Sequence, residues 1–318
     1  MKNILITGIT GFAGSHLAEL LVNTGNVHIT GTFLAEKSLK NVSAIEKKLD
    51  LVRIDLTHQH DVNALITTKK LDEIYHLAAS SSVRNSFVNP SETFHNNIDA
   101  EIFLLESVRK QNLTKTKLLL VSSAEVYGYV KKEDLPIDEE TPLRPANPYA
   151  VSKIAQDFLG LQYFLSYRQP IIRVRPFPHI GSRQTKGFVI ADFASQIALI
   201  EKGKQKPVIS VGNLEAKRDF TDVRDMVKAY ALLMERGQTG DVYNIGSGKQ
   251  YAIQDVLDML LAMSTVKITV AQDPSLLRPS DNPELVCDPS KMKKLTEWKT
   301  TIPLKKSLQD VLAYWRKQ

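Results

Sequence analysis

The residues with the clearest capacity for chemistry are Tyr149 and Lys153, which stand four positions apart after Asn147-Pro148. Proline suits the first turn of a helix, and the four-residue spacing places both side chains on one helix face. A free tyrosine, with a pKa near ~10, is a poor proton carrier at neutral pH. An ammonium about 4 Å away supplies about 4 kcal/mol at an effective dielectric near ~20, enough to lower that pKa by about 3 units. We therefore expect Lys153 to make Tyr149 a usable acid or base.

The same spacing recurs once, in Tyr127 and Lys131. A single Tyr-x-x-x-Lys is expected by chance in a chain of this composition. No sustained helical pattern follows Tyr127, because the segment 128–136 begins with glycine and ends with proline. We therefore expect this second copy to be inactive.

Polar residues with complementary chemistry follow the apolar run Lys117 to Ser122. Ser123 can hydrogen-bond an oxygen that is being reduced or oxidised. Glu125 has two open interpretations: it removes a carbon-bound proton, or it bonds backbone groups in a loop at the strand end.

Three glycines at a spacing of three, Gly8, Gly11 and Gly14, lie between a strand-like run and an amphipathic helix. Gly8 permits a tight turn, Gly11 lets the backbone approach a pyrophosphate, and Gly14 lets the helix pack closely on the strand. The helix opens at Phe12 and Ala13, whose N–H groups face the anion. This pattern predicts a dinucleotide site. The second strand ends at Phe33 without an acidic residue or an arginine beside it, so the choice between NAD and NADP stays open, with NADPH favoured.

Strand-length apolar runs alternate with segments of helical periodicity through the first half of the chain. The expected strands are Asn3–Thr7, Val27–Phe33, Leu51–Ile54, Glu73–Leu77, Lys117–Ser122 and Ile171–Arg175, and the expected helices include Phe12–Val22, Phe94–Val108 and Ala150–Leu165. The alternation predicts an α/β fold, a Rossmann-type doubly wound parallel sheet with helices on both faces. Ligands then bind at the carboxyl ends of the strands.

The regular alternation of strand and helix patterns ends after Arg175, which indicates a smaller, interleaved C-terminal α/β domain for the substrate. We assign residues 1–176 and about 213–245 to dinucleotide binding, and about 177–212 and 246–318 to substrate binding. A helix is expected from about Phe188 to Glu201.

The composition describes an ordinary globular protein of 318 residues, with 43% hydrophobic and 24% charged residues and a net charge of +6. The positive balance suits an anionic small molecule. We expect no nucleic-acid partner, because the basic clusters are short and lack interleaved aromatics. We expect no membrane partner and a cytoplasmic location, and we expect no metal, because Cys287 is the single cysteine and no histidine has a partner at ligand spacing.

These motifs together resemble those of the extended short-chain dehydrogenase/reductase family of nucleotide-sugar enzymes. The matching strings are Thr7-Gly8-x-x-Gly11-x-x-Gly14, Asp55-Leu56, His76-Leu77-Ala78-Ala79, Ser122-Ser123, Tyr149-x-x-x-Lys153 and Arg218-Asp219-Phe220-Thr221-Asp222-Val223. Within the family the chain is most similar to the GDP-mannose branch of dehydratases and reductases. The strings that carry this likeness are Arg175 to Gln184, Gly187-Phe188-Val189, Val211 to Glu215 and Leu277-Arg278-Pro279-Ser280-Asp281.

The resemblance implies a set of site residues. The cofactor set is Gly8, Gly11, Phe12, Ala13, Gly14, Asp55, Leu56, Leu77, Ala78, Ala79, Tyr149 and Lys153, with Asp55 on the adenine amino group and Lys153 on the nicotinamide ribose. The substrate set is Ser81, Glu125, His179, Phe188, Val189, Arg218 and Arg278, with the two arginines on the diphosphate. The catalytic set is Ser123, Tyr149, Lys153 and Glu125, and Asn97 helps to order the site.

The resemblance also implies the reaction, which is NAD(P)H-dependent reduction of the 4-keto group of GDP-4-keto-6-deoxy-D-mannose to GDP-rhamnose or a close epimer. Three departures from the branch bear on this expectation. Pro178 replaces an asparagine that would contact substrate, and the first turn reads Gly11-Phe12-Ala13-Gly14 where dehydratases carry Gly-Gln-Asp-Gly. The arginine pair of dehydratases after the second strand is also missing. The last two departures favour a reductase.

Three alternatives stay open. Glu125 matches the catalytic base of a GDP-mannose 4,6-dehydratase, another nucleotide-sugar 4-reductase or epimerase is consistent with the motifs, and a non-catalytic dinucleotide sensor has the same fold. The expected helices Phe94–Val108 and Ala150–Leu165 resemble those that form a four-helix bundle in family dimers, so a homodimer is expected.

Overall fold

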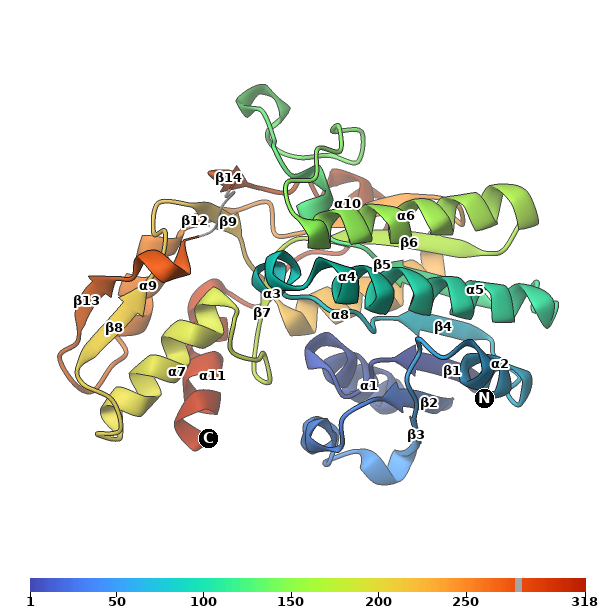
Figure 1. Cartoon of the computed structure of the whole chain (residues 1–318), viewed down its shortest axis with the longest axis horizontal. Helices are drawn as coiled ribbons and strands as arrows, with labels where there is room; N and C mark the ends of the chain where they lie inside the picture. Colours follow the sequence, from blue (N-terminus) through green and yellow to red (C-terminus); the bar gives the residue numbers. More distant parts are fainter. Residues whose placement is uncertain (278–281) are drawn as a thin grey trace.

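The computed structural model of the chain describes residues 1–277 and 282–318. Its centre is a seven-stranded sheet in the order β11-β6-β5-β4-β1-β2-β3, in which all neighbouring strands run parallel (Figure 1). The strands are β1 (Lys2–Thr7), β2 (Val27–Phe33), β3 (Leu49–Arg53), β4 (Glu73–His76), β5 (Lys117–Val121), β6 (Ile171–Pro176) and β11 (Val242–Ile245). The Rossmann-type doubly wound sheet expected from the sequence is confirmed.

Helices cover both faces of this sheet because successive strand residues point to opposite sides. Ile4 and Ile6 belong to one buried cluster, which includes residues of helices α1 and α8. Leu5 belongs to another, which includes residues of α2 and α5. The helices around the sheet are α1 (Phe12–Thr24), α2 (Gln59–Thr67), α5 (Ala100–Lys110), α6 (Pro148–Tyr167), α8 (Val223–Arg236) and α10 (Ser290–Thr296).

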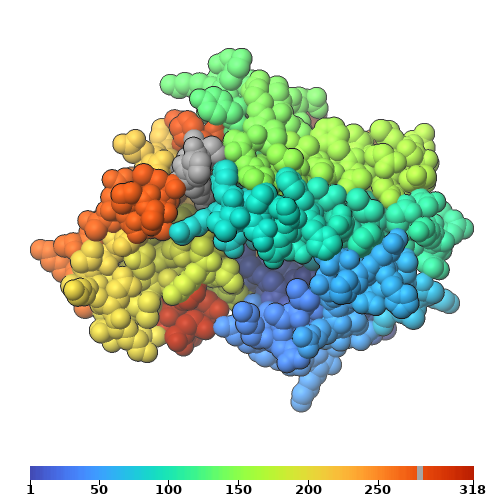
Figure 2. All heavy atoms as spheres, viewed as in Figure 1, coloured from blue at the N-terminus to red at the C-terminus, as the bar shows by residue number. Residues whose placement is uncertain are grey.

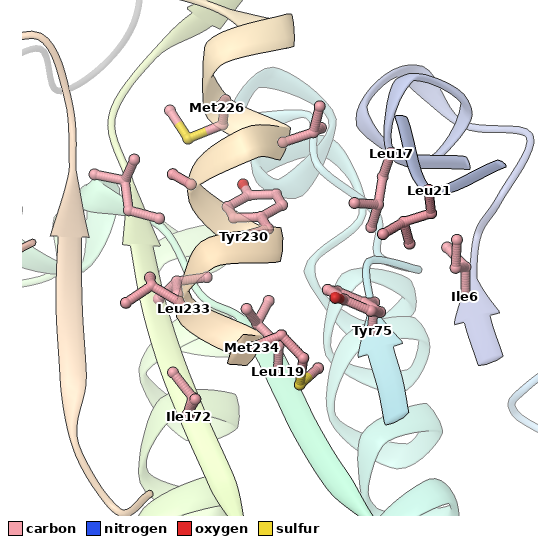
Figure 3. Close-up of a cluster of buried hydrophobic side chains, with 14 of the residues drawn as sticks. Ile6, Leu17, Leu21, Tyr75, Leu119, Ile172, Met226, Tyr230, Leu233 and Met234 are labelled. Atoms are coloured by element: carbon pink, nitrogen blue, oxygen red, sulfur yellow. The ribbon is translucent and has the colours of Figure 1, made fainter. Parts of the chain in front are cut away.

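Helix α8, which comes late in the chain, packs against strands formed by the first part of the chain. Its Met226, Tyr230 and Leu233 belong to the same buried cluster as the strand residues Tyr75 and Leu119 (Figure 3). Burying large apolar side chains of this kind contributes about 1.5–3 kcal/mol each. The sheet is therefore completed by residues far beyond the segment that starts it.

A smaller part of the molecule has its own core, with buried residues from α7, α9 and α11. It lies beside the carboxyl edge of the sheet, at the left in Figure 1. Its elements and the remaining short ones are β7 (His179–Ile180), α7 (Val189–Glu201), β8 (Val208–Val211), β9 (Lys217–Asp219), β10 (Thr221–Asp222), β12 (Gln250–Ala252), α9 (Ile253–Leu261), β13 (Thr269–Gln272), β14 (Glu284–Leu285) and α11 (Leu304–Lys317). We keep the domain boundaries given above as a proposal.

The expected helix Phe94–Val108 differs in the structure. The chain forms α3 (Val83–Val88) and α4 (Pro90–Phe94), then a π-helical turn at His95–Asp99, and only then α5. The predicted range runs across this turn because a π-turn is a single-turn insertion, with helix continuing on either side of it. The turn coincides with a buried asparagine, Asn97.

A buried charge cluster joins α6 to the sheet. Asp157 accepts hydrogen bonds from Arg173 at 2.6 Å and from Arg175 at 2.7 Å, and its side chain is fully buried. The two guanidinium groups are 6% and 4% exposed, so water cannot replace the carboxylate. This single carboxylate therefore compensates two buried positive charges.

Replacing Asp157 with Asn should lower the free energy of unfolding by about 3–5 kcal/mol, because two buried cations lose their counter-charge. Urea unfolding followed by circular dichroism measures the change. The control is Glu235→Gln, which breaks an ion pair with Arg236 whose side chains are 67% and 48% exposed, and it should cost less than about 1 kcal/mol. Equal losses in the two variants would contradict the assignment.

Candidate active site

The carboxyl ends of β1, β4 and β5 meet at one edge of the sheet, where the site residues gather. Figure 2 shows the molecule hollowed at this edge, with the dark blue atoms of the N-terminal segment recessed between the two parts. The glycine turn follows β1, the Leu77–Ala79 segment follows β4, and Ser123 follows β5. Strand order alone brings these three segments together.

The glycine turn has the shape that a dinucleotide pyrophosphate requires. Gly8 has a φ of +68°, and a Cβ there would lie 3.0 Å from the Cα of Ala78. A Cβ on Gly14 would overlap the carbonyl oxygen of Gly8. Helix α1 begins at Phe12 without a side-chain cap, so its first N–H groups can bind an anion. The residues present therefore fit an NAD(P) pyrophosphate.

Thr7 joins this turn to the loop after β4. Its hydroxyl oxygen accepts hydrogen bonds from the N–H groups of Leu77 and Ala78, both at 3.2 Å. Asp55 follows β3, and Oδ1 of its carboxylate accepts bonds from the N–H and hydroxyl of Thr57. Leu56 is buried and Ala79 is half-buried, and the assignment of these residues to the cofactor stays a prediction.

The proposed catalytic groups come together around Tyr149, which is 7% exposed. Burial raises the pKa of Tyr149 above its usual value, contact with the Ser123 hydroxyl lowers it, and the charge of Glu125 raises it again. Oε2 of Glu125 accepts a hydrogen bond from the side chain of Asn147 at 3.0 Å. Asn147 also caps α6, because its Oδ1 accepts from the N–H of Ala150. One residue thus fixes both the helix that carries Tyr149 and the carboxylate beside it.

Lys153 corrects one expectation. We expected its ammonium to lower the pKa of Tyr149, but burial holds that pKa above normal. The ammonium of Lys153 instead donates to the carbonyl of Val121 at 2.8 Å and to Oε1 of Gln156 at 2.7 Å. An ammonium has three donors, so one is left for a ribose hydroxyl. Because its pKa is raised, Tyr149 stays protonated at neutral pH, and the protonated form is the one that can donate a proton.

Tyr127, the first residue of the second Tyr-x-x-x-Lys copy, has a structural role, as expected. It is fully buried, donates to Asn244 at 2.7 Å and accepts from Arg175 at 3.0 Å. Lys131 is exposed and paired with Glu133. The two side chains of this copy share no site.

Asn97 orders the loop after β4. Its Oδ1 accepts from the N–H of Ser80 at 2.7 Å, and its amide donates to the Ser80 carbonyl at 3.2 Å. The same amide donates to the hydroxyl of Ser152 on α6 at 2.9 Å. Asn97 therefore ties the loop after β4 to the helix that carries the catalytic pair.

A cavity of about 390 Å³ opens beside this loop. Ser81 and Phe188 line it, together with Ser80, Ser82, Arg84, Asn85, Asn89, Glu92, Thr93, Thr185, Lys186 and Gly187. Two of the sequence-predicted substrate residues are thus brought to one cavity.

Three of the other predicted substrate residues, His179, Val189 and Arg218, are not among those that line this cavity. The ring of His179 stacks on Phe12 with centroids 5.6 Å apart, which places it against the glycine turn. Val189 begins α7 and packs against the smaller core. Arg218 lies on β9 and donates to the carbonyls of Lys217 and Asn282. Arg278 lies outside the described residues.

Among residues 1–277 and 282–318, no group of three His, Cys, Asp or Glu side chains is arranged to hold a metal ion. Within the same ranges, no helix combines the length and the apolar character that crossing a membrane requires.

Sequence reasoning missed Asn147, Glu101 and Gln156 as parts of the site. Glu101 carried a usable signal, because it lies on the same helix face as the apolar Leu104, Leu105 and Val108. A carboxylate at such a position is almost always buried with a partner. Gln156 had no comparable signal.

The sheet, the glycine turn and the Ser123–Tyr149–Lys153 set define an NAD(P)-dependent oxidoreductase of the extended short-chain dehydrogenase/reductase class. The family model described as GDP-mannose 4,6 dehydratase matches residues 5–311. The chain belongs to this family. The resemblance drawn from the motifs is confirmed.

Individual relatives cover almost the whole chain. The GDP-6-deoxy-D-mannose reductase of Pseudomonas aeruginosa is 32% identical over 314 residues, covering 99% of this chain and 97% of that protein. A GDP-mannose 4,6-dehydratase of Vibrio cholerae is 30% identical over 350 residues, covering 98% and 93%. The structure of RMD from Pseudomonas aeruginosa complexed with NADPH has a TM-score of 0.87 at 30% identity, covering 100% of this chain and 99% of that one.

Replacing Gly14 with Ala should weaken NADPH binding at least about tenfold and lower the free energy of unfolding by about 1–3 kcal/mol. The new methyl group meets the Gly8 carbonyl, so the helix must move away from the strand. Fluorescence titration with NADPH and urea unfolding measure the two effects. Wild-type affinity in the folded variant would show that this close packing does not shape the cofactor site.

Proposed function

We propose that the chain catalyses NAD(P)H-dependent reduction of the 4-keto group of GDP-4-keto-6-deoxy-D-mannose, giving GDP-rhamnose or a close epimer. The single observation that carries this proposal is the buried Tyr149 in contact with Ser123 at the carboxyl edge, beside the glycine turn. The full-length likeness to a GDP-6-deoxy-D-mannose reductase supports the substrate. The net charge of +6 suits its diphosphate.

The protein's own groups divide the reaction between them. The cofactor, when bound, supplies a hydride. Ser123 donates a hydrogen bond to the substrate carbonyl oxygen and orients it, and Tyr149 transfers its proton to that oxygen as negative charge develops. The high pKa of Tyr149 keeps this proton in place before the reaction. Lys153 has one ammonium donor left to hold the nicotinamide ribose.

NADPH is the proposed cofactor, with NAD as the alternative. No carboxylate ends β2 to bind a free ribose hydroxyl, and the nearby Glu36 is paired with Arg53 at 2.9 Å. The NADPH bound in the neighbouring Pseudomonas aeruginosa structure supports the same choice. The need for a reduced nicotinamide and the buried free thiol of Cys287 support the cytoplasm as the place of action.

The proposal is tested by incubating the protein with GDP-4-keto-6-deoxy-mannose and either NADPH or NADH, and separately with GDP-mannose alone. We expect loss of cofactor absorbance with a product two hydrogens heavier, faster with NADPH. Tyr149→Phe should abolish turnover but leave NADPH binding intact. Loss of water from GDP-mannose without net cofactor consumption would replace the proposal with a dehydratase.

The dehydratase is the second candidate because the charge of Glu125 acts on Tyr149 and raises its pKa, which supports a carboxylate base close to the tyrosine. Such an enzyme would use Glu125 to remove the proton at carbon 5.

Glu125→Gln separates the two candidates. The amide can still share a hydrogen bond with Asn147 but cannot accept a proton, so reduction should stay within about threefold of wild type. Dehydration, if present, should disappear. Steady-state rates with both substrates measure this, and loss of reduction by more than a hundredfold would make Glu125 part of the reductase chemistry.

We also propose a homodimer formed through α6. Val151, Phe158 and Leu165 recur every seven residues along this helix and are 43%, 49% and 57% exposed. A seven-residue spacing keeps apolar groups on one helix face, which is the pattern of a helix-packing surface. A second copy that presents the same face would cover it.

Phe158→Glu should therefore produce a monomer, because burying the new charges across a twofold interface is unfavourable. Light scattering measures the mass. Lys131→Glu, an exposed change away from α6, is the control and should leave the dimer intact. A monomeric wild type would refute the proposal.

A further inference from the structure

A chain of buried polar side chains lies beneath Lys153 and plays no part in the mechanism given above. Oε1 of Gln156 accepts from the Lys153 ammonium at 2.7 Å, and Nε2 of the same amide donates to Oε2 of Glu101 at 2.8 Å. Lys153 is 4% exposed, Gln156 1% and Glu101 0%. A cation on α6 and a carboxylate on α5 are thus joined through one amide, out of contact with water.

The amide can take only one orientation in this chain. An ammonium offers donors alone and an ionised carboxylate offers acceptors alone. With the amide reversed, its NH₂ group would face the Lys153 ammonium and its oxygen would face Glu101, so both hydrogen bonds would be lost. Gln156 is therefore ordered by the ammonium donor at one end and the carboxyl acceptor at the other.

His76 lies at the far end and stays neutral. The Thr7 hydroxyl oxygen accepts hydrogen bonds from the N–H groups of Leu77 and Ala78. Its O–H therefore donates to Nδ1 of His76, with 2.8 Å between the oxygen and the nitrogen. The ring proton of His76 is then on Nε2, 3.9 Å from Oε2 of Glu101. Burial and the Lys153 charge lower the pKa of His76 to about 3. His76 therefore adds no second cation beside Glu101.

The other carboxylate close to Lys153 is already used. Asp157, on the same helix, is held by the two buried arginines of β6. The titratable groups around the lysine are thus Glu101 on α5, His76 on β4, and Tyr149 and Asp157 on α6. Of these, Glu101 is the carboxyl group that no arginine or lysine side chain bonds directly, within the part of the chain that the structure describes. Burial raises the pKa of Glu101 and the Lys153 charge lowers it, so each of the two groups favours the charged form of the other.

We propose that Glu101 is a positioning residue, which acts through Gln156 to keep the Lys153 ammonium charged and aimed at the cofactor. The catalytic readout of this inference rests on the proposed function, whereas its cofactor-binding readout does not. The inference assigns a role to a buried carboxylate that touches neither substrate nor cofactor.

The consequence is a pH dependence with a defined sign. Burial lowers the pKa of Lys153, and the charge of Glu101 raises it. If the negative charge is removed, burial is unopposed and the lysine loses its proton at a lower pH. A close opposite charge shifts a pKa by about 1–3 units, and with an amide between the two groups we expect about 1 unit.

The test is Glu101→Gln, which keeps the shape of the side chain and removes its charge. NADPH affinity by fluorescence titration, and kcat/KM for reduction, are measured from pH 6 to 9.5. Both should fall on the alkaline side at a pH about 1 unit lower than in the wild type. The matched control is Glu73→Gln, which removes a buried carboxylate at the opposite end of β4, and its profiles should match the wild type.

A second variant covers the case in which Glu101→Gln does not fold. Gln156→Met keeps the volume and removes both hydrogen bonds, so it should shift the profiles in the same direction. Profiles of either folded variant that coincide with the wild type would overturn the inference. If no substrate is reduced at all, the proposed function fails, while the pH dependence of NADPH affinity still decides the role of Glu101.

Discussion

One hydroxyl group, that of Thr7, holds the functional edge of this protein together. Its oxygen accepts hydrogen bonds from two backbone N–H groups of the loop after β4, and its O–H donates a hydrogen bond to His76. The glycine turn begins at the next residue, so the geometry of the cofactor cradle is fixed to the neighbouring strand. A hydroxyl with all its hydrogen bonds made inside the protein is rigid, because any shift leaves a buried donor unpaired. The cradle is thus built before a ligand arrives, which reduces the ordering cost of binding.

Buried side-chain amides behind the cofactor cradle also hold segments of the chain together. Asn97 links the β4 loop to α6, and Asn147 links α6 to Glu125. Each uses both ends of its amide, so each fixes two segments of the chain at once. Low local dielectric strengthens such networks when every member is satisfied. The side-chain amides of these two asparagines therefore fix the helix that carries Tyr149 and Lys153.

The sequence predicted the parallel sheet, all of its strands except β11, and the dinucleotide turn, because these depend on local periodicity and on glycine spacing. It also predicted that Ser123 and Tyr149 lie close together, because Ser123 follows the end of a strand and Tyr149 begins a helix at the same edge of the sheet. It did not indicate the hydrogen-bond partners of Lys153, because Val121 and Gln156 reach this side chain only through the burial of α6. The π-turn around Asn97 was missed for a related reason, as was the placement of His179 on Phe12. Contacts between distant segments leave no period in the sequence.

The chain crosses between the two parts of the molecule more than once. After β6 it leaves the sheet to form α7 and β8, and it returns with α8 and β11 before leaving again for α9 and α11. On the ribosome, the first six strands therefore emerge well before the helix that covers one of their faces. The part of that apolar face that α8 covers, which includes Tyr75 and Leu119, stays open to water until α8, which ends at Arg236, has been synthesised. The nascent chain therefore passes through a state with exposed apolar surface, which favours aggregation.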